Sequence, residues 1–312
     1  MKKRIYILYH GGNCADGFSC AFIAWLKYGK GATYHPMNYG DPLPEIESGS
    51  LVYMLDWSAP LEVLNEIGAR TELIVIDHHP TAKEAIQNCY AKHTLFDERR
   101  CGAILTWNFF FRENYLPNFF KYIDDRDRWK WAMSESREFS AGLRSYPFDF
   151  AVWEELTGMC YKEGQRPYSP LIDEKEIPAI KKEGAACLRQ VHQQVAATLK
   201  GVRFGAFHIG PQALEPRIRI RTLGQDMFNS EEHDLIRYAP VVNCTANISE
   251  VGEALLKEYP TAQFSASYFD DSKGNRIWSF RSREDFDCSV IAKAFGGGGH
   301  KNAAGATVKI EL

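Results

Sequence analysis

The residues of this 312-residue chain that most clearly point to chemistry are the acid and two histidines Asp77-His78-His79. They directly follow the apolar run LIVI (73–76), where an acid and two imidazoles are costly to bury unless they bind something. Neighbouring His and Asp side chains also allow one residue to ligate a metal ion while another orients it. The alternative is a polar loop capped by Asp77, and we favour the divalent metal site.

Three further residues carry similar chemistry earlier in the chain. His10 and Asp16 flank the Gly-rich turn in HGGNCADGF, a combination that suits a divalent cation and, at a helix N-terminus, a phosphate. Each of the two also has a simpler interpretation, as a strand-end histidine or a helix N-cap. Asp56 directly follows the apolar run VYML, where it could bridge two metal ions or cap the next helix.

An acidic segment follows in YIDDRDRW (122–129), which has three acids and two arginines. For Asp124 and Asp127 we favour a solvated salt-bridge patch. Mixed His and carboxylate ligation suits Mn²⁺, with Mg²⁺, Zn²⁺ or Co²⁺ as possible substitutes. The sequence therefore predicts a manganese-type site rather than a purely sulfur-ligated one.

The C-terminal segment GGGGHKNAAG (296–305) offers an anion-binding feature. Its glycines permit close backbone approach, and their amides can form a nest for an anion. His300 adds a donor, and Arg281 in SFRSRED can make charge-assisted contacts to phosphate. The alternative, a flexible surface turn, fits less well because the segment lies between a helix-like run and a terminal strand.

The elements that must position these residues alternate between strand-like and helical runs, a pattern typical of a parallel α/β sheet. Strands are expected at 4–10, 51–57 and 71–79, and helices at 16–29, 60–69 and 101–111. The polar residues stand where the strands end. Ligands bind at the carboxyl ends of strands in open parallel sheets, so we expect these residues to converge.

The second half of the chain predicts a smaller α/β domain. A polar, proline-containing stretch near 165–172 ends the first domain, and 174–200 is expected to be a long amphipathic helix. Strands and helices mix after residue 201. We therefore expect a catalytic domain over 1–170, a helical linker over 171–200 and a substrate-binding domain over 201–312.

Composition narrows the class of protein. A net charge of −3 argues against a chain coated in basic residues for wrapping long nucleic acid. The eight cysteines form no CxxC pair, which disfavours a zinc knuckle or a disulfide framework and favours a reducing cytoplasm. No apolar run reaches membrane-spanning length, so no contact with a membrane is expected.

Taken together, the segments HGGNCADGF, MLDWS, DHH, IDDRD and GGGGHKNAAG resemble the DHH phosphoesterase superfamily, in the family's order. The last segment resembles the DHH-associated C-terminal domain of nanoRNase-type and RecJ-type enzymes. The resemblance spans nearly the whole chain, although 130–235 matches only loosely. It implies a parallel-sheet DHH domain joined by a helical linker to a smaller α/β domain.

The resemblance also implies a role for each matching residue. His10 is expected to ligate a first metal ion, Asp16 and His78 a second, and Asp56 both. The second-metal acid after the triplet is placed on Asp125. His79 would face the scissile phosphate and Asp77 would support the histidines. In the C-terminal domain, the residues expected to grip the substrate are Arg281, Gly297, Gly298, Gly299 and His300.

The chain departs from the family pattern at position 14. The family motif commonly has an Asp there, whereas this chain has Cys14, and a thiolate prefers softer metals than Mn²⁺. Three outcomes are open: a weaker first site, selection of another metal, or a water in place of the carboxylate. We favour a weakened first site that substrate oxygens help to complete.

The resemblance implies a two-metal, Mn²⁺-dependent phosphodiesterase that cleaves short oligonucleotides or linear dinucleotides to mononucleotides. Alternatives within the family are a RecJ-like single-strand exonuclease and a phosphatase of cyclic dinucleotides or phosphoadenosine phosphate. An alternative outside the enzymes is a nucleotide-binding sensor that has lost catalysis. No protein partner is evident, although family members often form homodimers.

Overall fold

The computed structural model describes residues 3–111, 116–161, 175–208, 218–221, 236–283 and 286–310. The chain divides into two compact units, Met1–Leu188 and Arg189–Leu312. The predicted fold class is confirmed, because a parallel sheet with helices forms the first unit and a smaller α/β unit follows. No helix in the described part of the chain combines the length and apolar character needed to cross a membrane.

The first unit is built on a five-stranded parallel sheet with the order β2-β1-β3-β4-β5. The strands are β1 (Ile5–His10), β2 (Thr33–Met37), β3 (Leu51–Leu55), β4 (Glu72–Asp77) and β5 (His93–Phe96). The register pairs Tyr9 with Leu55, and Leu55 with Ile76. The carboxyl ends of the three central strands therefore lie level with one another, and the polar residues that follow them share one edge of the sheet.

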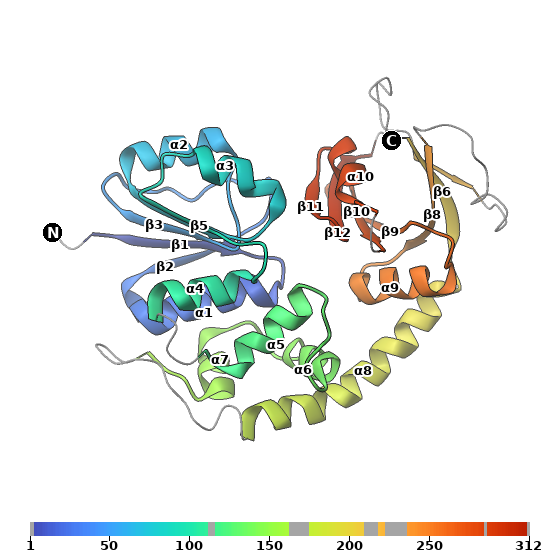
Figure 1. Cartoon of the computed structure of the whole chain (residues 1–312), viewed down its shortest axis with the longest axis horizontal. Helices are drawn as coiled ribbons and strands as arrows, with labels where there is room; N and C mark the ends of the chain where they lie inside the picture. Colours follow the sequence, from blue (N-terminus) through green and yellow to red (C-terminus); the bar gives the residue numbers. More distant parts are fainter. Residues whose placement is uncertain are drawn as a thin grey trace. The chain divides into compact units, whose positions relative to one another are not determined.

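Helices cover both faces of this sheet, as Figure 1 shows. α1 (Ala15–Tyr28) and α4 (Gly102–Phe111) lie on one face, and α2 (Leu61–Arg70) and α3 (Lys83–Asn88) on the other. Two separate clusters of buried apolar side chains result, which explains why β1, β3 and β4 are apolar almost throughout. The short 3₁₀ segments Gly29–Gly31 and Pro80–Ala82 complete the turns.

Further helices extend the first unit beyond the sheet. They are α5 (Asn118–Asp127), α6 (Ser136–Leu143), α7 (Phe150–Thr157) and the start of α8 (Ile177–Leu199). Their apolar faces join the cluster around Phe119, Phe139 and Trp153, so α5 is fixed by packing on several sides. α8 lies within the stretch proposed as the linker, whose first residues, up to 174, are outside the described ranges.

The second unit contains a seven-stranded sheet with the order β11-β12-β10-β9-β8-β6-β7. The strands are β6 (Arg203–His208), β7 (Ile218–Arg221), β8 (Ile236–Asn243), β9 (Phe264–Asp270), β10 (Asn275–Ser282), β11 (Gly298–His300) and β12 (Ala303–Lys309). All neighbours are antiparallel except β8 and β9. The helices are α9 (Ile248–Glu258) and α10 (Ser289–Ala294), and Phe207, Trp278 and Phe280 form part of the core.

The structure adds edge strands that the sequence did not predict. β2 has the sequence TYHPM and β5 is only four residues long, so neither shows an extended apolar run. Both lie at edges of the sheet, where polar residues and proline are tolerated because one side of the strand makes no ladder bonds. The helices α6 and α7 were also not predicted.

Candidate metal centre

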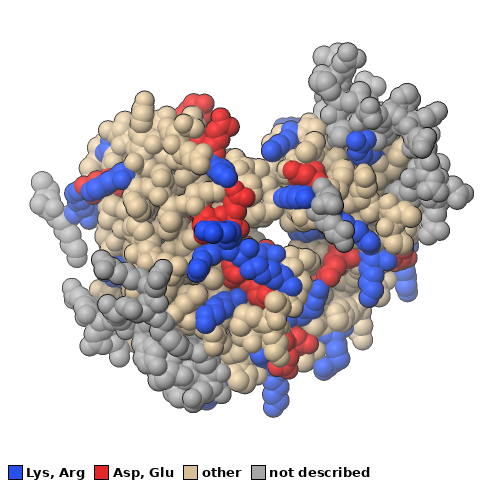
Figure 2. Space-filling model, in the orientation of Figure 1, with Lys and Arg blue, Asp and Glu red and all other residues tan. Residues whose placement is uncertain are grey.

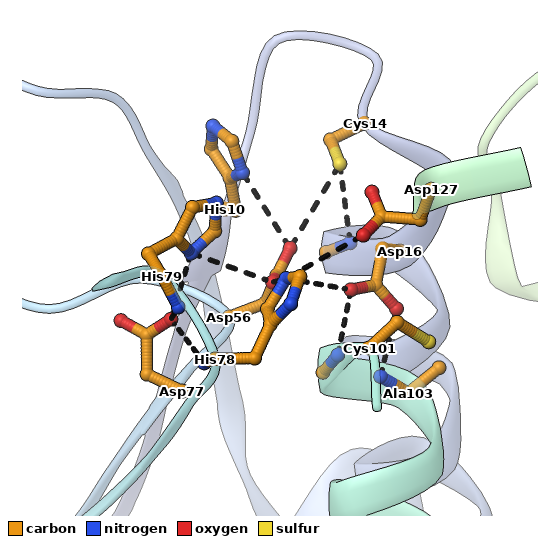
Figure 3. Close-up of polar contacts among 12 residues, drawn as sticks. His10, Cys14, Asp16, Asp56, Asp77, His78, His79, Cys101, Ala103 and Asp127 are labelled. Atoms are coloured by element: carbon orange, nitrogen blue, oxygen red, sulfur yellow. Dashed lines mark hydrogen bonds and ion pairs between the residues drawn. The ribbon is translucent and has the colours of Figure 1, made fainter. Parts of the chain in front are cut away.

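Five potential ligands from separate parts of the chain converge at the carboxyl edge of the parallel sheet (Figure 3). His10 ends β1, Asp56 follows β3, and His78 follows β4. Asp16 lies in the first turn of α1, and Asp127 is the last residue of α5. Since Asp16, Asp56 and His78 are 2% exposed or less, the group is buried rather than a solvated patch.

The turn between β1 and α1 shows why HGGNCADGF has its composition. Cys14 is the N-cap of α1, and its sulfur accepts a hydrogen bond from the backbone N–H of Gly17. A Cβ atom on Gly17 would lie 2.1 Å from the carbonyl oxygen of His10, so only glycine lets the helix start this close to the strand. The close approach holds Asp16 beside the end of β1.

Asp56 stands at the centre of the group and faces two sets of donor atoms. Its Oδ1 atom lies 3.1 Å from Nε2 of His78. Its Oδ2 atom lies 3.5 Å from Nδ1 of His10 and 3.8 Å from the sulfur of Cys14. Each oxygen therefore serves a different side, which is the arrangement expected of a carboxylate that bridges two cations.

Asp16 is anchored by the start of α4. Its two carboxylate oxygens accept hydrogen bonds of 2.7 Å each from the backbone N–H groups of Gly102 and Ala103. Its Oδ2 atom is also 3.5 Å from Nε2 of His78. A Cβ atom on Gly102 would lie 2.7 Å from Cβ of Asp56, so this glycine lets α4 reach both carboxylates.

The acid that α5 contributes is Asp127, and the placement of the second-metal acid on Asp125 needs correction. Oδ2 of Asp127 is 3.5 Å from Nε2 of His78. Asp125 instead accepts hydrogen bonds from the backbone N–H groups of Ala132 and Met133. Two residues span roughly 200° around an α-helix, so the two acids point in opposite directions. Asp124 does pair with Arg128 and Lys130, but it is buried rather than solvated and also accepts the backbone N–H of Cys101, and the salt-bridge interpretation fails for Asp127.

Asp77 and His79 form a hydrogen-bonded pair beside these ligands. Oδ1 of Asp77 lies 2.7 Å from Nδ1 of His79 and also accepts the backbone N–H groups of both histidines. Its Oδ2 atom accepts a 2.5 Å hydrogen bond from Ser58. Burial acts to raise the pKa of Asp77, but the charge and hydrogen bond of His79 outweigh it and lower the pKa. The ionised carboxylate therefore fixes the orientation of His79.

Burial and the close contacts among these acids and imidazoles shift their pKa values. Burial lowers the pKa of His10, but hydrogen bonds to Asp56 and Cys14 outweigh this and raise it to about 11. Burial and the charge of Asp56 raise the pKa of Asp16 well above its usual value. For Asp56, hydrogen bonds from His10 and His78 overcome burial and hold the pKa well below its usual value.

The residues present fit divalent metal ions. Donor atoms about 2.1 Å from a common ion lie roughly 3.0–3.4 Å from one another, close to the separations around Asp56. Nδ1 of His10 and Oδ2 of Asp127 are buried, and their contacts to Asp56 and His78 are 3.5 Å, longer than a good hydrogen bond. Such atoms are costly to bury unless a ligand satisfies them. Several compact sets of donors include Asp56, and two of them lie on its two sides: His10, Cys14 and Asp56, and Asp16, Asp56 and His78.

The expected phosphate-gripping residues lie in the second unit. Arg281 is on β10, donates a 2.8 Å hydrogen bond to Ser249 and packs over Gly252 of α9. His300 ends β11, and both Arg281 and His300 are in register with Ala303 of β12. Gly297 precedes β11, while Gly298 and Gly299 belong to it. The sheet thus brings the arginine and the Gly-rich segment to the same level.

Two contributors had not been singled out in the sequence. Gly102 carries no sequence signal, because a glycine at a helix start is ordinary until the neighbouring carboxylate is known. Ser58 lies two residues after Asp56, and nothing in that segment indicates its contact with Asp77. Their roles depend on close contacts between distant segments, which one sequence does not reveal.

Comparison with known families identifies the C-terminal part. Residues 245–312 match the DHHA1 domain. Over 324 aligned residues, the chain is 28% identical to an uncharacterized protein of Acanthamoeba polyphaga mimivirus. The alignment covers 96% of this chain and 66% of that protein, so the chain spans just under two thirds of the length of this relative.

Two solved structures are similar at low sequence identity. A pGpG-specific phosphodiesterase, PggH, from Vibrio cholerae aligns with a TM-score of 0.45 and 14% identity, over 99% of this chain and 94% of that one. An uncharacterized protein from Helicobacter pylori aligns with a TM-score of 0.38 and 16% identity, over 98% and 94%. The interpretation of the site therefore depends on its own geometry and on the DHHA1 match.

Proposed function

We propose that the chain is a DHH phosphoesterase, as its DHHA1 domain over residues 245–312 supports, and that it hydrolyses short oligonucleotides or linear dinucleotides to mononucleotides. The coarser assignment is a metal-dependent phosphoesterase, a hydrolase of phosphoester bonds. The finer proposal adds two Mn²⁺ ions at the edge of the parallel sheet. Mg²⁺, Co²⁺ or Zn²⁺ are the possible substitutes.

The observation that carries the proposal is the position of Asp56 between two sets of donors. One oxygen faces His78 at 3.1 Å, and the other faces His10 at 3.5 Å. His10, Cys14 and Asp56 would hold the first ion, and Asp16, Asp56, His78 and Asp127 the second. Ions held by these residues would supply an activated water at neutral pH and would neutralise charge on the phosphate oxygens.

The other groups of the chain then bind and orient the substrate. Nδ1–H of His79 donates to the ionised Asp77 carboxylate, so Nε2 is the ring atom left to face a phosphate or leaving-group oxygen, to which it would donate only when the ring is protonated. Ser58 keeps the Asp77 carboxylate in place. In the DHHA1 domain, Arg281, His300 and the Gly-rich segment would grip a phosphate or terminal nucleotide.

Charge and composition support a short substrate over a long one. The chain has a net charge of −3, whereas a processive single-strand exonuclease needs an extended basic track. A nest of glycine amides can hold one chain end, which suits a substrate whose ends lie close to the scissile bond. Cyclic dinucleotides have no free end and would be poorer substrates.

A length series tests the proposal. The full chain with Mn²⁺ is given labelled dinucleotides, five-mers and twenty-mers, together with a cyclic dinucleotide and pyrophosphate. We expect kcat/KM to be highest for the dinucleotide and to disappear in the His78→Ala variant, which should melt at nearly the wild-type temperature. Equal rates on dinucleotides and twenty-mers would instead favour the exonuclease, and binding without turnover would favour a sensor.

A further inference from the structure

A pair of tryptophans follows the helix that brings Asp127 to the metal centre. Trp129 and Trp131 are only partly buried, whereas Trp107 and Trp153 of the same unit are 2% and 0% exposed. Consecutive Cα atoms are 3.8 Å apart, so the Cα atom of Trp129 lies within about 7.6 Å of that of Asp127. Aromatic surface is therefore kept accessible directly beside a potential metal ligand.

The backbone of this pair is held in an unfavourable conformation. The φ angles of Trp129 and Trp131 are 54° and 53°, in a region that bulky side chains rarely occupy. The backbone N–H groups of Lys130 and Trp131 donate to the carbonyl oxygen of Asp125. The carboxylate of Asp125 accepts hydrogen bonds from the backbone N–H groups of Ala132 and Met133. Such strain persists only where the surroundings enforce it, and it concentrates at functional sites. Asp125 provides that enforcement.

Cations surround the two indole rings. Trp129 and Trp131 meet edge to face, with ring centroids 4.8 Å apart. The guanidinium of Arg137, on α6, lies 4.3 Å from the Trp131 centroid, while Arg126 and Arg137 approach Trp129 only to 5.8 and 6.0 Å. Trp131 is thus closely covered by Arg137, and Trp129 is the ring with looser contacts. Figure 2 shows basic side chains gathered over the region of α5 and α6.

Two buried polar atoms in this cluster have no partner. Nε1 of Trp131 and Nε of Arg126 are buried without a hydrogen bond to any residue that the structure describes. A small crevice lined by Asp16, Arg126, Asp127 and Arg144, among others, extends from the metal centre to the same arginine. Arg126 therefore lines a crevice beside Asp16 and Asp127 and also lies 5.8 Å from the Trp129 ring, which connects the tryptophan pair to the metal centre.

We propose that Trp129 is a stacking platform for a nucleobase of the substrate, held in position by Trp131, Arg137 and Asp125. A base has a flat π-face for the indole, and its phosphate has the charge that Arg126 would neutralise. Stacking tolerates any base, so this site gives affinity for nucleotides rather than base identity. The inference rests on the proposed function for its substrate class, but its first test does not require turnover.

Binding measurements test the platform directly. The full chain with Mn²⁺ is titrated calorimetrically with AMP, GMP and ribose 5-phosphate. We expect wild type to bind the nucleotides about 5- to 150-fold more tightly than ribose 5-phosphate, the range that base stacking supplies. Trp129→Ala should lose this advantage and Trp129→Phe should keep most of it. Trp25→Ala is the matched control, because Trp25 is also partly buried but stacks on Phe150, and it should behave as wild type.

Kinetics separate stacking from a merely structural role. In Trp129→Ala we expect KM for a linear dinucleotide to rise by the factor by which nucleotide affinity falls, while kcat changes less than about twofold. A dinucleotide analogue without bases should show no change in KM. Unaltered nucleotide affinity in Trp129→Ala, or equal losses with and without bases, would overturn the proposal. The two proposals can also be told apart. If no dinucleotide is cleaved but the tighter binding of AMP and GMP over ribose 5-phosphate still depends on Trp129, the stacking role is supported and the proposed hydrolysis is wrong.

Discussion

The contact between Gly102 and Asp56 allows a prediction whose size can be worked from the structure. A Cβ atom on Gly102 would lie 2.7 Å from Cβ and 2.9 Å from Oδ1 of Asp56. Carbon atoms pack at about 3.5–4.0 Å, so in Gly102→Ala the Asp56 side chain must retreat by roughly 1 Å. A misplacement of that size in a catalytic group can lower the rate by about 100-fold.

We therefore expect Gly102→Ala to lower kcat/KM for a linear dinucleotide by about 100-fold and to weaken Mn²⁺ binding. Overpacking costs about 1–3 kcal/mol, so the variant should still be folded and should melt a few degrees below wild type. Steady-state hydrolysis, calorimetric Mn²⁺ titration and thermal melting measure the three effects.

A second glycine provides the matched control. A Cβ atom on Gly31 would meet nothing within 4 Å, so Gly31→Ala should keep wild-type turnover and Mn²⁺ affinity. If Gly102→Ala also keeps both, then Asp56 does not need its observed position, and the argument that it bridges two ions is refuted. Loss of folding in Gly102→Ala would be visible in the melting curve and would contradict the expected modest cost.

The remaining predictions concern the other metal ligands and a substrate-binding residue. Asp127→Asn should lower Mn²⁺ affinity, whereas Asp125→Asn should leave it unchanged, as measured by calorimetry. A loss of Mn²⁺ affinity in Asp125→Asn alone would instead support Asp125 as the metal ligand, as predicted from the sequence. The pKa of His10 is raised to about 11, so it must lose a proton when a cation binds. Mn²⁺ affinity should then rise by up to about tenfold per pH unit between pH 6 and 8, and a flat profile would contradict this. Arg281→Ala should raise KM with little change in kcat, as measured by initial rates.

Much of the site could be predicted because strand ends are visible in the sequence. His10, Asp56 and His78 each end or follow an apolar run, and parallel strands place such ends at one edge. The structure brings these three together with Asp16. The DHHA1 domain was likewise indicated by the GGGGH segment and is matched by residues 245–312.

What the sequence could not decide was the orientation of α5. The segment IDDRD offers three acids within four residues, and only the packing of the helix determines which one faces the metal centre. Apolar contacts of α5 through Phe119 and Phe120 set that orientation and turn Asp127 inward. Asp125 then serves the strained segment at Trp129 and Trp131, a role that has no sequence signature.

Cys14 lies among the donors of the first metal set. Its sulfur lies 3.8 Å from Oδ2 of Asp56, close enough to complete the first set of donors. A thiolate would favour a softer ion at that position than at the second. The proposal of a weakened first Mn²⁺ site therefore predicts two ions of unequal affinity.

The most direct test of the central claim is the rate of linear-dinucleotide hydrolysis by the metal-free full chain as Mn²⁺ is added stepwise. The account predicts no turnover in EDTA and a rate that saturates only after two ions per chain have bound, with the weaker affinity at the site of His10, Cys14 and Asp56. Turnover that persists in EDTA, or a dinucleotide that remains intact at every Mn²⁺ concentration, would contradict it.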